Sequence, residues 1–319
     1  MDYLVIYSNK KRDDAIMLKS MFNNCIELNI NCTDIDNVEI IKKHIEQNHI
    51  TTIIFFGLEF GWDKLIIFLR KNYKKLKIKV INNTSEALMY YDYERNNFFK
   101  LLELSRNNLI DCIAFLKRGQ YILYKKLGYK CCYLMQNYKL NFIDKNIKMN
   151  ENKDINIGIF PLNYTWDKNI FNQLCIGKFI ENSNIYFNNL DSRMLEFLNT
   201  MNIRNTPINI ENNAEDIISK LKNIDVCVSC NFTDYLNPIF FISMELGIPC
   251  LLGDTTDLFS EDDEIKKYIV TKFEDNAIEN AKFVEKILNK KSEIIKKYKQ
   301  WKKQYDEKYE KNIQEFMSI

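Results

Sequence analysis

The chain has 319 residues but only eight glycines, four prolines and two histidines, and these shortages exclude several common kinds of site. No Gly-x-Gly-x-x-Gly follows the first strand-like segment, YLVIYSNKKRDD, so a dinucleotide fingerprint is absent, and there is no Walker-type lysine loop. Both histidines, His44 and His49, lie in IIKKHIEQNHI, a connection between a helix and a strand. Because neither is expected at the carboxyl end of a strand, acid–base chemistry by histidine is not expected.

The chain also lacks an excess of charge of one sign. Its 45 basic and 43 acidic residues leave a net charge of +2, so no global field favours nucleic acid, and no such partner is expected. No segment approaches the roughly 18 apolar residues that a membrane helix needs. The N-terminal segment MDYLVIYSNKKRDD has no signal-peptide pattern, so we expect a cytoplasmic protein.

Cysteine is present, but not in a pattern that builds a disulfide or metal framework. The nine cysteines are odd in number and scattered, which favours reduced thiols. Cys227 and Cys230 have Cys-x-x-Cys spacing without a second pair, so we expect buried thiols and no zinc. Asp34 and Asp36 precede a helical segment and are expected to cap it. No metal site is therefore predicted.

Hydrophobic residues make up 46% of the chain, and apolar runs alternate regularly with amphipathic segments. This alternation is typical of parallel sheets covered on both faces, so we predict an α/β protein with two doubly wound domains. The expected strands of the first half are YLVIYS from Tyr3, TTIIFF from Thr51, KIKVIN from Lys77, IDCIAFL from Ile110 and KCCYLMQ from Lys130. Those of the second half are INIGIFPL from Ile155, NIYFNN, TPINI, DVCVSC from Asp225 and PCLLGD from Pro249.

A polar interruption sets the domain boundaries. The segment NYKLNFIDKNIKMNENKDI has little that could be buried, which is typical of a linker. Trp301, Tyr305 and Tyr309 recur four residues apart near the end of the chain and are expected to dock the last helix. The predicted divisions are an N-terminal domain, a linker, a second domain, and C-terminal helices that pack back across the hinge: residues 1–138, 139–155, 156–272 and 273–319.

Polar residues follow two strands of the second domain. Asp234 comes soon after DVCVSC, and Asp254, Thr255 and Thr256 follow PCLLG. In open α/β sheets, ligands bind outside the carboxyl ends of the strands. We therefore expect these groups at the rim of a ligand-binding cleft between the two domains.

The segment CNFTDYLNPIFFISMELGIPCLLG resembles the donor-binding domain of GT-B glycosyltransferases, in particular the large retaining group 1, or family 4. The signature of that family is two glutamates ahead of an apolar helix, which ends in Gly-(Ile/Val)-Pro and a strand. Gly247-Ile248-Pro249 sets the register, which places Asp234 at the first glutamate and Ile242 at the second. The resemblance implies that Asp234 contacts the donor sugar. Glu245, on nearly the same helix face as Ile242, would substitute at the nucleotide ribose.

Each of these assignments has a structural alternative. Asp234 also suits an N-cap or Asx turn before Asn237-Pro238, and Glu245 also suits a solvated helix position. Asn237 itself is included among the expected donor-binding residues.

A second match, IGIFPLNYTWDKNIFNQLCIGKFI from Ile157, resembles the first strand, loop and helix of the same donor domain. The family commonly places a basic residue there near the donor diphosphate, which implies this role for Lys168, close to a helix start that favours an anion. The alternative for Lys168 is a solvated surface position. Asn169 is expected to shape this loop at the donor. Thr255 and Thr256 are expected to donate hydrogen bonds to the same diphosphate, or else to cap a short helix.

The first half of the chain resembles acceptor domains only loosely. Where relatives often have His-Gly-Ser after the third strand, this chain has Asn83-Thr84-Ser85, which removes an imidazole. The basic run RKNYKKLKIK, residues 70–79, fits anionic lipid headgroups, and so a lipid-linked acceptor and peripheral contact with the inner face of a membrane. The alternative for this run is a solvated helix end.

The sequence therefore predicts a glycosyltransferase that moves a sugar from a nucleotide diphosphate sugar to a hydroxyl acceptor, which is a glycan, a lipid-linked glycan or a protein. Lys168 and the threonine loop would offset charge on the leaving diphosphate while Asp234 orients the sugar. No cofactor and no metal are expected, and retention of configuration is implied only by the resemblance. The alternative is a catalytically silent GT-B subunit that partners an active transferase. The missing second glutamate and the missing His-Gly-Ser both favour that alternative.

Overall fold

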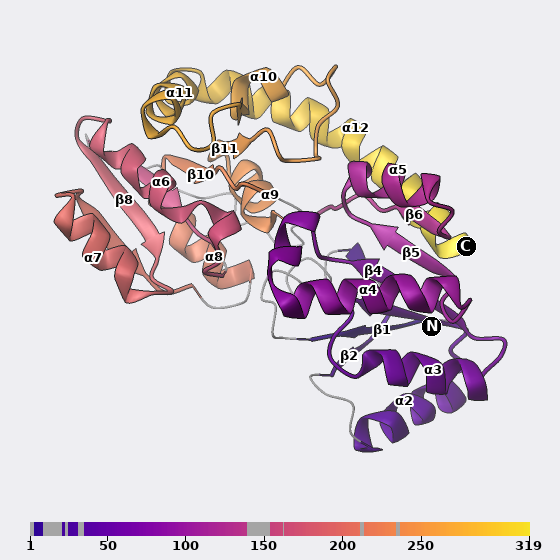
Figure 1. Ribbon diagram of the computed structural model, residues 1–319. Coiled ribbons are helices and arrows are strands. Elements are labelled where there is room, and N and C mark those ends of the chain that lie inside the picture. Colours follow the sequence, from indigo (N-terminus) through magenta and orange to yellow (C-terminus); the bar gives the residue numbers. More distant parts are fainter. Residues whose placement is uncertain are drawn as a thin grey trace. The chain divides into compact units, whose positions relative to one another are not determined.

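The computed structural model describes residues 3–8, 21–22, 25–30, 35–138, 154–161, 163–210, 214–233 and 237–319. It divides into two compact units (Figure 1). Unit 1 comprises Met1–Gln136 and Lys308–Ile319, and unit 2 comprises Asn137–Glu307. Most of the segment interpreted from sequence as a linker lies outside the described residues.

Unit 1 is built on a parallel sheet of six described strands in the order β2-β1-β3-β4-β5-β6. Because β1 lies between β2 and β3, the chain reverses its direction of winding between β1 and β3. The strands are β1 (Tyr3–Tyr7), β2 (Ile26–Asn29), β3 (Thr52–Phe56), β4 (Lys77–Asn82), β5 (Cys112–Phe115) and β6 (Cys131–Tyr133). The helices are α2 (Ile35–Asn48), α3 (Trp62–Asn72), the 3-10 helix η1 (Glu86–Tyr90), α4 (Asp92–Arg106) and α5 (Arg118–Lys126).

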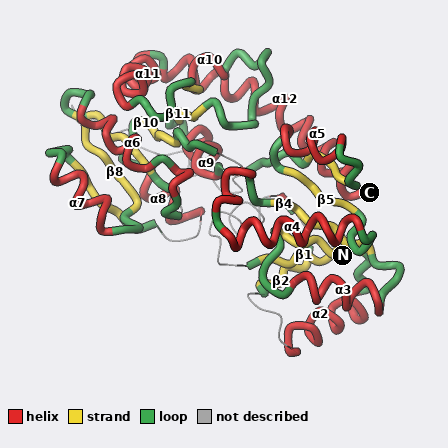
Figure 2. The backbone as a smooth tube through the Cα atoms, viewed as in Figure 1, coloured by secondary structure: helices red, strands yellow, loops and turns green. Residues whose placement is uncertain are grey.

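The core of unit 1 comes from strands that are apolar on both faces. In β3, Ile53 to Phe56 are all buried, as expected for a central parallel strand between helical layers. Figure 2 shows helices of this unit, such as α3 and α4, beside its strands β1 and β4. Gly57 follows β3 with φ +83°, and a Cβ at this position would lie 2.8 Å from Oδ1 of Asn83. A glycine is therefore required where the loop after β3 meets the loop after β4.

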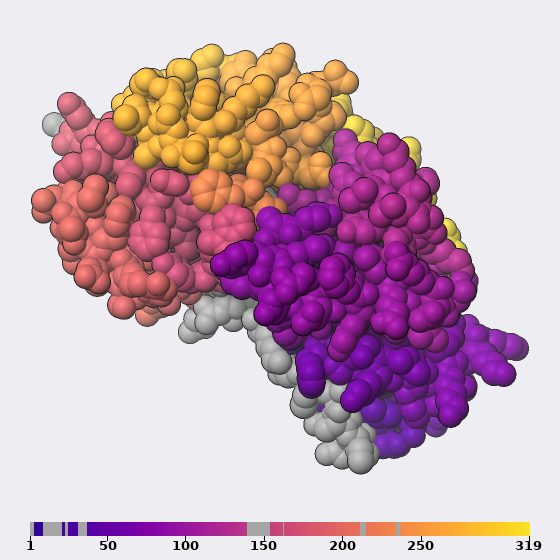
Figure 3. All heavy atoms as spheres, in the orientation of Figure 1, coloured from indigo at the N-terminus to yellow at the C-terminus, as the bar shows by residue number. Residues whose placement is uncertain are grey.

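Unit 2 is built on a second parallel sheet, in the order β12-β11-β10-β7-β8-β9. This is the doubly wound order 3-2-1-4-5-6, so its switch point lies between β7 and β10. The strands are β7 (Ile155–Ile159), β8 (Ser183–Asn188), β9 (Asn205–Ile208), β10 (Val226–Ser229), β11 (Cys250–Gly253) and β12 (Val270–Thr271). The helices are η2 (Trp166–Lys168), α6 (Ile170–Cys175), η3 (Ile176–Lys178), α7 (Ser192–Thr200), α8 (Ala214–Leu221), α9 (Pro238–Glu245), α10 (Lys266–Ile269) and α11 (Ala277–Asn289). Within this unit, α7 lies beside β8 (Figure 1), and the surface coloured for the segment of α10 and α11 lies on the other side of the unit from that of α7 (Figure 3).

Helix α9 is the most deeply buried helix among the described parts of unit 2. Its residues from Pro238 to Met244 are all buried, so it is apolar around its whole circumference. The sequence starts it sharply, because Pro238 occupies the first turn and the side chain of Asn237 accepts a hydrogen bond from the Phe240 amide at 3.0 Å. Phe240 then packs edge-to-face against Tyr298 of the last helix, with ring centroids 5.9 Å apart.

The last helix, α12 (Lys291–Ser318), contributes to both units. Trp301 and Tyr305 are buried within unit 2 and Tyr309 within unit 1, which confirms that this aromatic stripe faces protein. The end of the helix is held in unit 1 by Lys79, which is fully buried and donates to the carbonyl oxygens of Phe316 and Met317 at 2.6 and 3.0 Å. A cation at this position complements the C-terminal end of the helix dipole.

The predicted α/β class with two doubly wound parallel sheets is confirmed, and each strand expected from an apolar run is present. Two further strands, β2 and β12, were not expected from the sequence. Strand β2 reads IELN and is only partly buried at the edge of its sheet, so it lacks a continuous apolar run. Strand β12 has two residues, which is too short to leave a pattern. Among the residues that the structure describes, no helix is long and apolar enough to cross a membrane.

Candidate functional site

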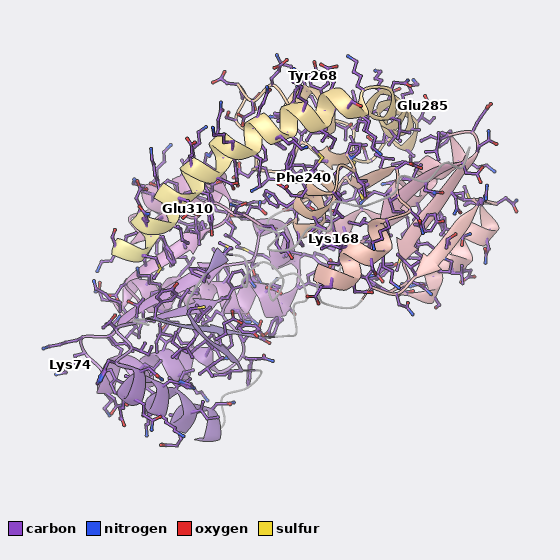
Figure 4. All side chains as sticks on the ribbon, turned by 180° about the vertical axis from the view of Figure 1, so that it is seen from behind. Lys74, Lys168, Phe240, Tyr268, Glu285 and Glu310 are labelled. Atoms are coloured by element: carbon purple, nitrogen blue, oxygen red, sulfur yellow. The ribbon has the colours of Figure 1, made fainter. Side chains whose placement is uncertain are left out.

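Lys168 lies at the switch point of unit 2, in the connection that leaves β7. The chain forms the short turn η2 at Trp166–Lys168 and enters α6 through Asn169, whose backbone is left-handed with φ 51°. Lys168 is only 4% exposed, so the alternative interpretation, a solvated surface lysine, is wrong (Figure 4). A cation at the switch point of a doubly wound sheet stands where such sheets bind their ligands.

Asn169 ties three loops together at this edge of the sheet. Its side-chain nitrogen donates to the carbonyl oxygen of Cys230, after β10, at 2.9 Å and to that of Glu274, after β12, at 2.6 Å. Its side-chain oxygen accepts from Asn172 at 2.7 Å. The amide of Asn169 is therefore occupied by protein groups, and its described contacts shape the loop.

Three more hydrogen bonds hold the segment that follows β7, and two of them come from the loop after β10. The amide of Phe232 donates to the carbonyl oxygen of Asp167 at 2.8 Å. Gln173 donates to the carbonyl oxygen of Lys168 at 2.6 Å and accepts from the Cys230 amide at 3.2 Å. The backbone around Lys168 is therefore held on both sides of the switch point, which pre-organises its charge.

The loop after β11 joins the same edge. Thr255 donates its hydroxyl to the carbonyl oxygen of Asn231 at 2.8 Å, and the Asp254 amide donates to the Glu274 carboxylate at 2.7 Å. Gly253 permits this approach, because a Cβ there would lie 2.6 Å from Cγ of Glu274. The hydroxyl of Thr256 is buried and has no hydrogen-bond partner among the described residues. Of the two threonines, Thr255 is therefore engaged within the fold, whereas the described residues leave the hydrogen-bonding capacity of Thr256 unused.

Lys168 has a buried carboxylate as its neighbour. Asp167 is 1% exposed, and one of its carboxylate oxygens lies 4.0 Å from the Lys168 ammonium. Neither oxygen accepts a hydrogen bond within the described chain, although buried carboxylates usually do. The two charges therefore attract each other across 4.0 Å without a hydrogen bond between them. Sequence reasoning missed Asp167 because nothing in the order of residues shows that it is buried.

Aromatic rings border this edge of unit 2. Trp166 is 47% exposed and Phe232 is 38% exposed, and their ring centroids lie 6.3 Å apart. They come from the loops after β7 and β10, so both rings flank the switch point.

Asp234, the expected sugar ligand, lies outside the described residues, so its role stays a prediction. The N-cap of α9 is occupied by Asn237, whose side-chain nitrogen also donates to the Ser229 hydroxyl at 3.0 Å. Both ends of the Asn237 amide are therefore engaged within the fold, and the described contacts give Asn237 a structural role at the start of the helix.

The structure does not bring Glu245 to the switch-point edge. Helix α9 runs away from the carboxyl ends of the strands, and Glu245 is its last residue. There it accepts a hydrogen bond from the hydroxyl of Tyr298 at 2.9 Å. Ile242, which stands at the position of the second glutamate, is fully buried. No described carboxylate of α9 therefore faces the edge that carries Lys168.

Unit 1 has a polar and aromatic edge of its own, after β3 and β4. Glu59 is 4% exposed and accepts a hydrogen bond from Tyr93 of α4. Exposed rings adjoin the members of this pair in the sequence: Phe60 at 71%, Tyr90 at 78% and Tyr91 at 36%. We call Phe60, Tyr90, Tyr91 and Tyr93 the aromatic surface. Sequence reasoning missed it, although the aromatic residues in the connections that follow two predicted strands were the available signal.

The other sequence expectations concern Asn83-Thr84-Ser85, the basic stretch and the cysteines. Thr84 donates to Glu94 at 2.7 Å, and all three residues of its tripeptide are buried.

In the basic stretch 70–79, Arg70 is bound to the Asp111 carboxylate at 2.7 Å and Lys79 is internal, whereas Lys74 projects outward (Figure 4). Cys227 and Cys230 are fully buried thiols, as expected.

No group of three or more potential metal ligands was found among the described residues. The edge of unit 2 instead offers a buried ammonium, a hydroxyl and backbone groups, which is the chemistry of anion binding.

No family model and no curated protein match the sequence. The structure, in contrast, is similar to solved structures over its whole length. These are sucrose-phosphate synthase from Thermosynechococcus elongatus (TM-score 0.67, 10% identity), HepE from Anabaena in complex with UDP-glucose (0.67, 7%), and the apo form of the lipopolysaccharide outer core galactosyltransferase WaaB (0.62, 11%). Each comparison covers 100% of both chains. The chain has the GT-B fold, as its sequence predicted; at such low identity the likeness shows the fold and not the activity.

Proposed function

We propose that the protein transfers a sugar from a nucleotide diphosphate sugar to a hydroxyl acceptor. The observation that carries this proposal is the buried ammonium of Lys168, at the switch point of the unit 2 sheet. An ammonium held at a switch point by hydrogen-bonded loops stands where doubly wound sheets bind their ligands, and the diphosphate of such a donor supplies negative phosphates for it to bind.

The residues of this edge would act mainly by position and charge. Lys168 would offset the negative charge that develops on the diphosphate as the bond to the sugar breaks. Thr256 would donate its buried, unpartnered hydroxyl to the same group. Asp167 would balance the Lys168 charge before the donor binds. Asp234 keeps the proposed role of orienting the sugar through its hydroxyls.

A uridine diphosphate sugar is the donor to test first. HepE, which is similar over the whole chain, was solved with UDP-glucose and also with UDP and glucose. The exposed rings of Trp166 and Phe232 border the same edge and would stack on a flat face of the donor.

The acceptor is proposed to be a carbohydrate that binds at the aromatic surface of unit 1. Sugar rings have apolar faces that pack on aromatic rings and hydroxyls that bond to carboxylates. Here the exposed Tyr90 and Tyr91, with ring centroids 5.6 Å apart, directly precede Asp92 in the sequence, and the Glu59 carboxylate accepts a hydrogen bond from Tyr93.

A second candidate function is a silent GT-B subunit that binds a nucleotide sugar and partners an active transferase. The observation that favours it is Ile242, which is fully buried on α9 where the resemblance places a carboxylate. Release of free nucleoside diphosphate from UDP-, GDP- and ADP-sugars, with and without oligosaccharide acceptors, separates the two. Turnover supports the enzyme, whereas binding without turnover supports the silent subunit.

A further inference from the structure

An open groove of about 630 Å³ lies along helix α12 in unit 2, away from the site described above. Its lining consists of Gly247, Ile295, the neutral polar residues Ser292 and Gln300, and four lysines: Lys291, Lys296, Lys299 and Lys303. No aspartate or glutamate lines it.

The groove lies at the amino ends of the strands. Gly247 comes shortly before β11, and the Lys291 ammonium reaches the carbonyl oxygen of Asp225, directly before β10, at 3.4 Å. The candidate donor site is at the opposite, carboxyl ends of the same strands. A ligand in the groove is therefore not a second part of the donor.

The lysines of the groove differ from their neighbours on the same helix. Lys297 pairs with Glu264 at 2.7 Å, and Lys302 pairs with Asp306 at 2.6 Å, so both are neutralised within unit 2. Lys296, Lys299 and Lys303 are exposed, and none of the three has a hydrogen-bond or ionic partner in the part of the chain that the structure describes. The unpaired charges of this helix segment thus collect on the face that lines the groove.

The shape of this charged face indicates an extended, amphipathic partner. From residue 296 to residue 303 the helix rises by about 10 Å, which is longer than one phosphate group. Between the ammonium groups the groove offers Ile295, the backbone of Gly247 and the methylene stems of the lysines. A Cβ at Gly247 would meet no atom within 4 Å, so the floor is open there.

We propose that this groove is a docking site for the phosphodiester headgroups of anionic lipids at a membrane surface. The three unpaired lysines would each bind near a different phosphate, while the apolar floor contacts the glycerol region. This inference does not rest on the proposed glycosyl transfer, because it concerns the opposite edge of the sheet. It also differs from the basic stretch 70–79, where Arg70 and Lys79 are used inside unit 1.

The test is co-sedimentation of the full chain with phosphatidylcholine vesicles, with and without phosphatidylglycerol, at physiological salt. The wild-type protein should bind only the anionic vesicles. The triple variant Lys296→Gln, Lys299→Gln and Lys303→Gln should bind them more weakly, on the order of a hundredfold. Because these side chains are exposed and unpaired, its thermal unfolding should match that of the wild type, which keeps the test independent of folding.

A charge-matched control removes three exposed lysines from separate places on unit 2: Lys222→Gln, Lys267→Gln and Lys286→Gln. It should retain most of the binding. Equal losses in both triple variants would mean that net charge alone matters and would overturn the proposal. Loss of binding in Lys71→Gln, Lys74→Gln and Lys75→Gln, with the groove variant unaffected, would place the membrane contact on unit 1 and overturn it too.

Inorganic phosphate distinguishes a lipid surface from a small anion. If the groove binds headgroups of a membrane, millimolar phosphate should neither raise the unfolding temperature through these lysines nor displace the vesicles. Stabilisation by phosphate that is lost in the groove variant, together with displacement of the vesicles, would show a small-anion site and contradict the lipid proposal.

Discussion

The side-chain amide of Asn169 donates a hydrogen bond of 2.9 Å to the carbonyl oxygen of Cys230, and so joins the loops that follow β7 and β10. These loops flank the switch point of the unit 2 sheet, beside the buried ammonium of Lys168. The geometry of the proposed donor site therefore depends on a residue whose own amide is fully used inside the protein.

Two substitutions at Asn169 should separate its hydrogen bonds from its backbone conformation. Asn169→Gly keeps the left-handed backbone, with φ 51°, but removes the amide, and should lower the free energy of unfolding by about 1 to 3 kcal/mol. Asn169→Ala removes the amide and also strains the backbone, so it should cost about 1 kcal/mol more. Denaturant unfolding of both variants checks this. Equal stabilities would mean that the left-handed turn does not constrain this loop.

Asp167 and Lys168 should be energetically coupled. Removing either charge leaves the other buried without its neighbour 4.0 Å away, so Asp167→Asn and Lys168→Met should each destabilise the protein, by about 3 kcal/mol. The double variant should recover much of this loss, since neither charge is then left alone. A double-mutant cycle from thermal or denaturant unfolding measures the coupling. Strictly additive losses would show that Asp167 does not balance the charge of Lys168.

Substitutions in the aromatic surface of unit 1 should weaken acceptor binding and leave donor binding unchanged. Tyr90→Ala and Tyr91→Ala remove exposed rings, so folding should be unchanged while KM for an oligosaccharide acceptor rises, by about tenfold. Donor affinity, measured without acceptor, should stay at the wild-type value. Phe99→Ala, an exposed ring further along α4, is the matched control. An unchanged acceptor KM in the tyrosine variants would remove this surface from the proposal.

The thiols of Cys227 and Cys230 should be unreactive in the folded protein. Burial raises the pKa of Cys227 to about 12 and also raises the pKa of Cys230, so neither forms the nucleophilic thiolate near neutral pH. A thiol-reactive reagent at pH 8 should modify them only after denaturation, as mass spectrometry of tryptic peptides can show. Rapid modification of either cysteine in the native protein would contradict the buried position.

The sequence specified the fold where its signal was continuous. The segments that form β3, β4, β10 and β11 are buried on both faces of their sheets. Such strands leave a largely apolar run, which can be identified in the sequence without knowing the neighbouring strands. The helix start at Asn237-Pro238 was also readable, but the sequence could not tell which polar side chain near it forms the cap. The structure gives that role to Asn237, through its bond to the Phe240 amide.

The candidate site was only partly predictable, because burial and long-range bonds do not follow from spacing. Lys168 could be placed after β7, but not its burial or its buried neighbour Asp167. The helical spacing of Glu245 from Ile242 predicts a position close to the donor. The direction of α9 instead takes it to the far end of the helix, where it bonds to Tyr298, 53 residues later in the chain.

The most direct test of the central claim is calorimetric titration of UDP and UDP-glucose into the wild-type protein and Lys168→Met, in the presence of EDTA. The account predicts that both ligands bind the wild type without a divalent cation, and that Lys168→Met weakens both by about ten- to a hundredfold, because the lost contact is to phosphate in each. Circular dichroism must show that the variant is folded. Wild-type affinity in a folded Lys168→Met protein, or no binding of UDP-, GDP- or ADP-sugars to the wild type, would contradict the claim that this edge of unit 2 binds a nucleotide diphosphate sugar.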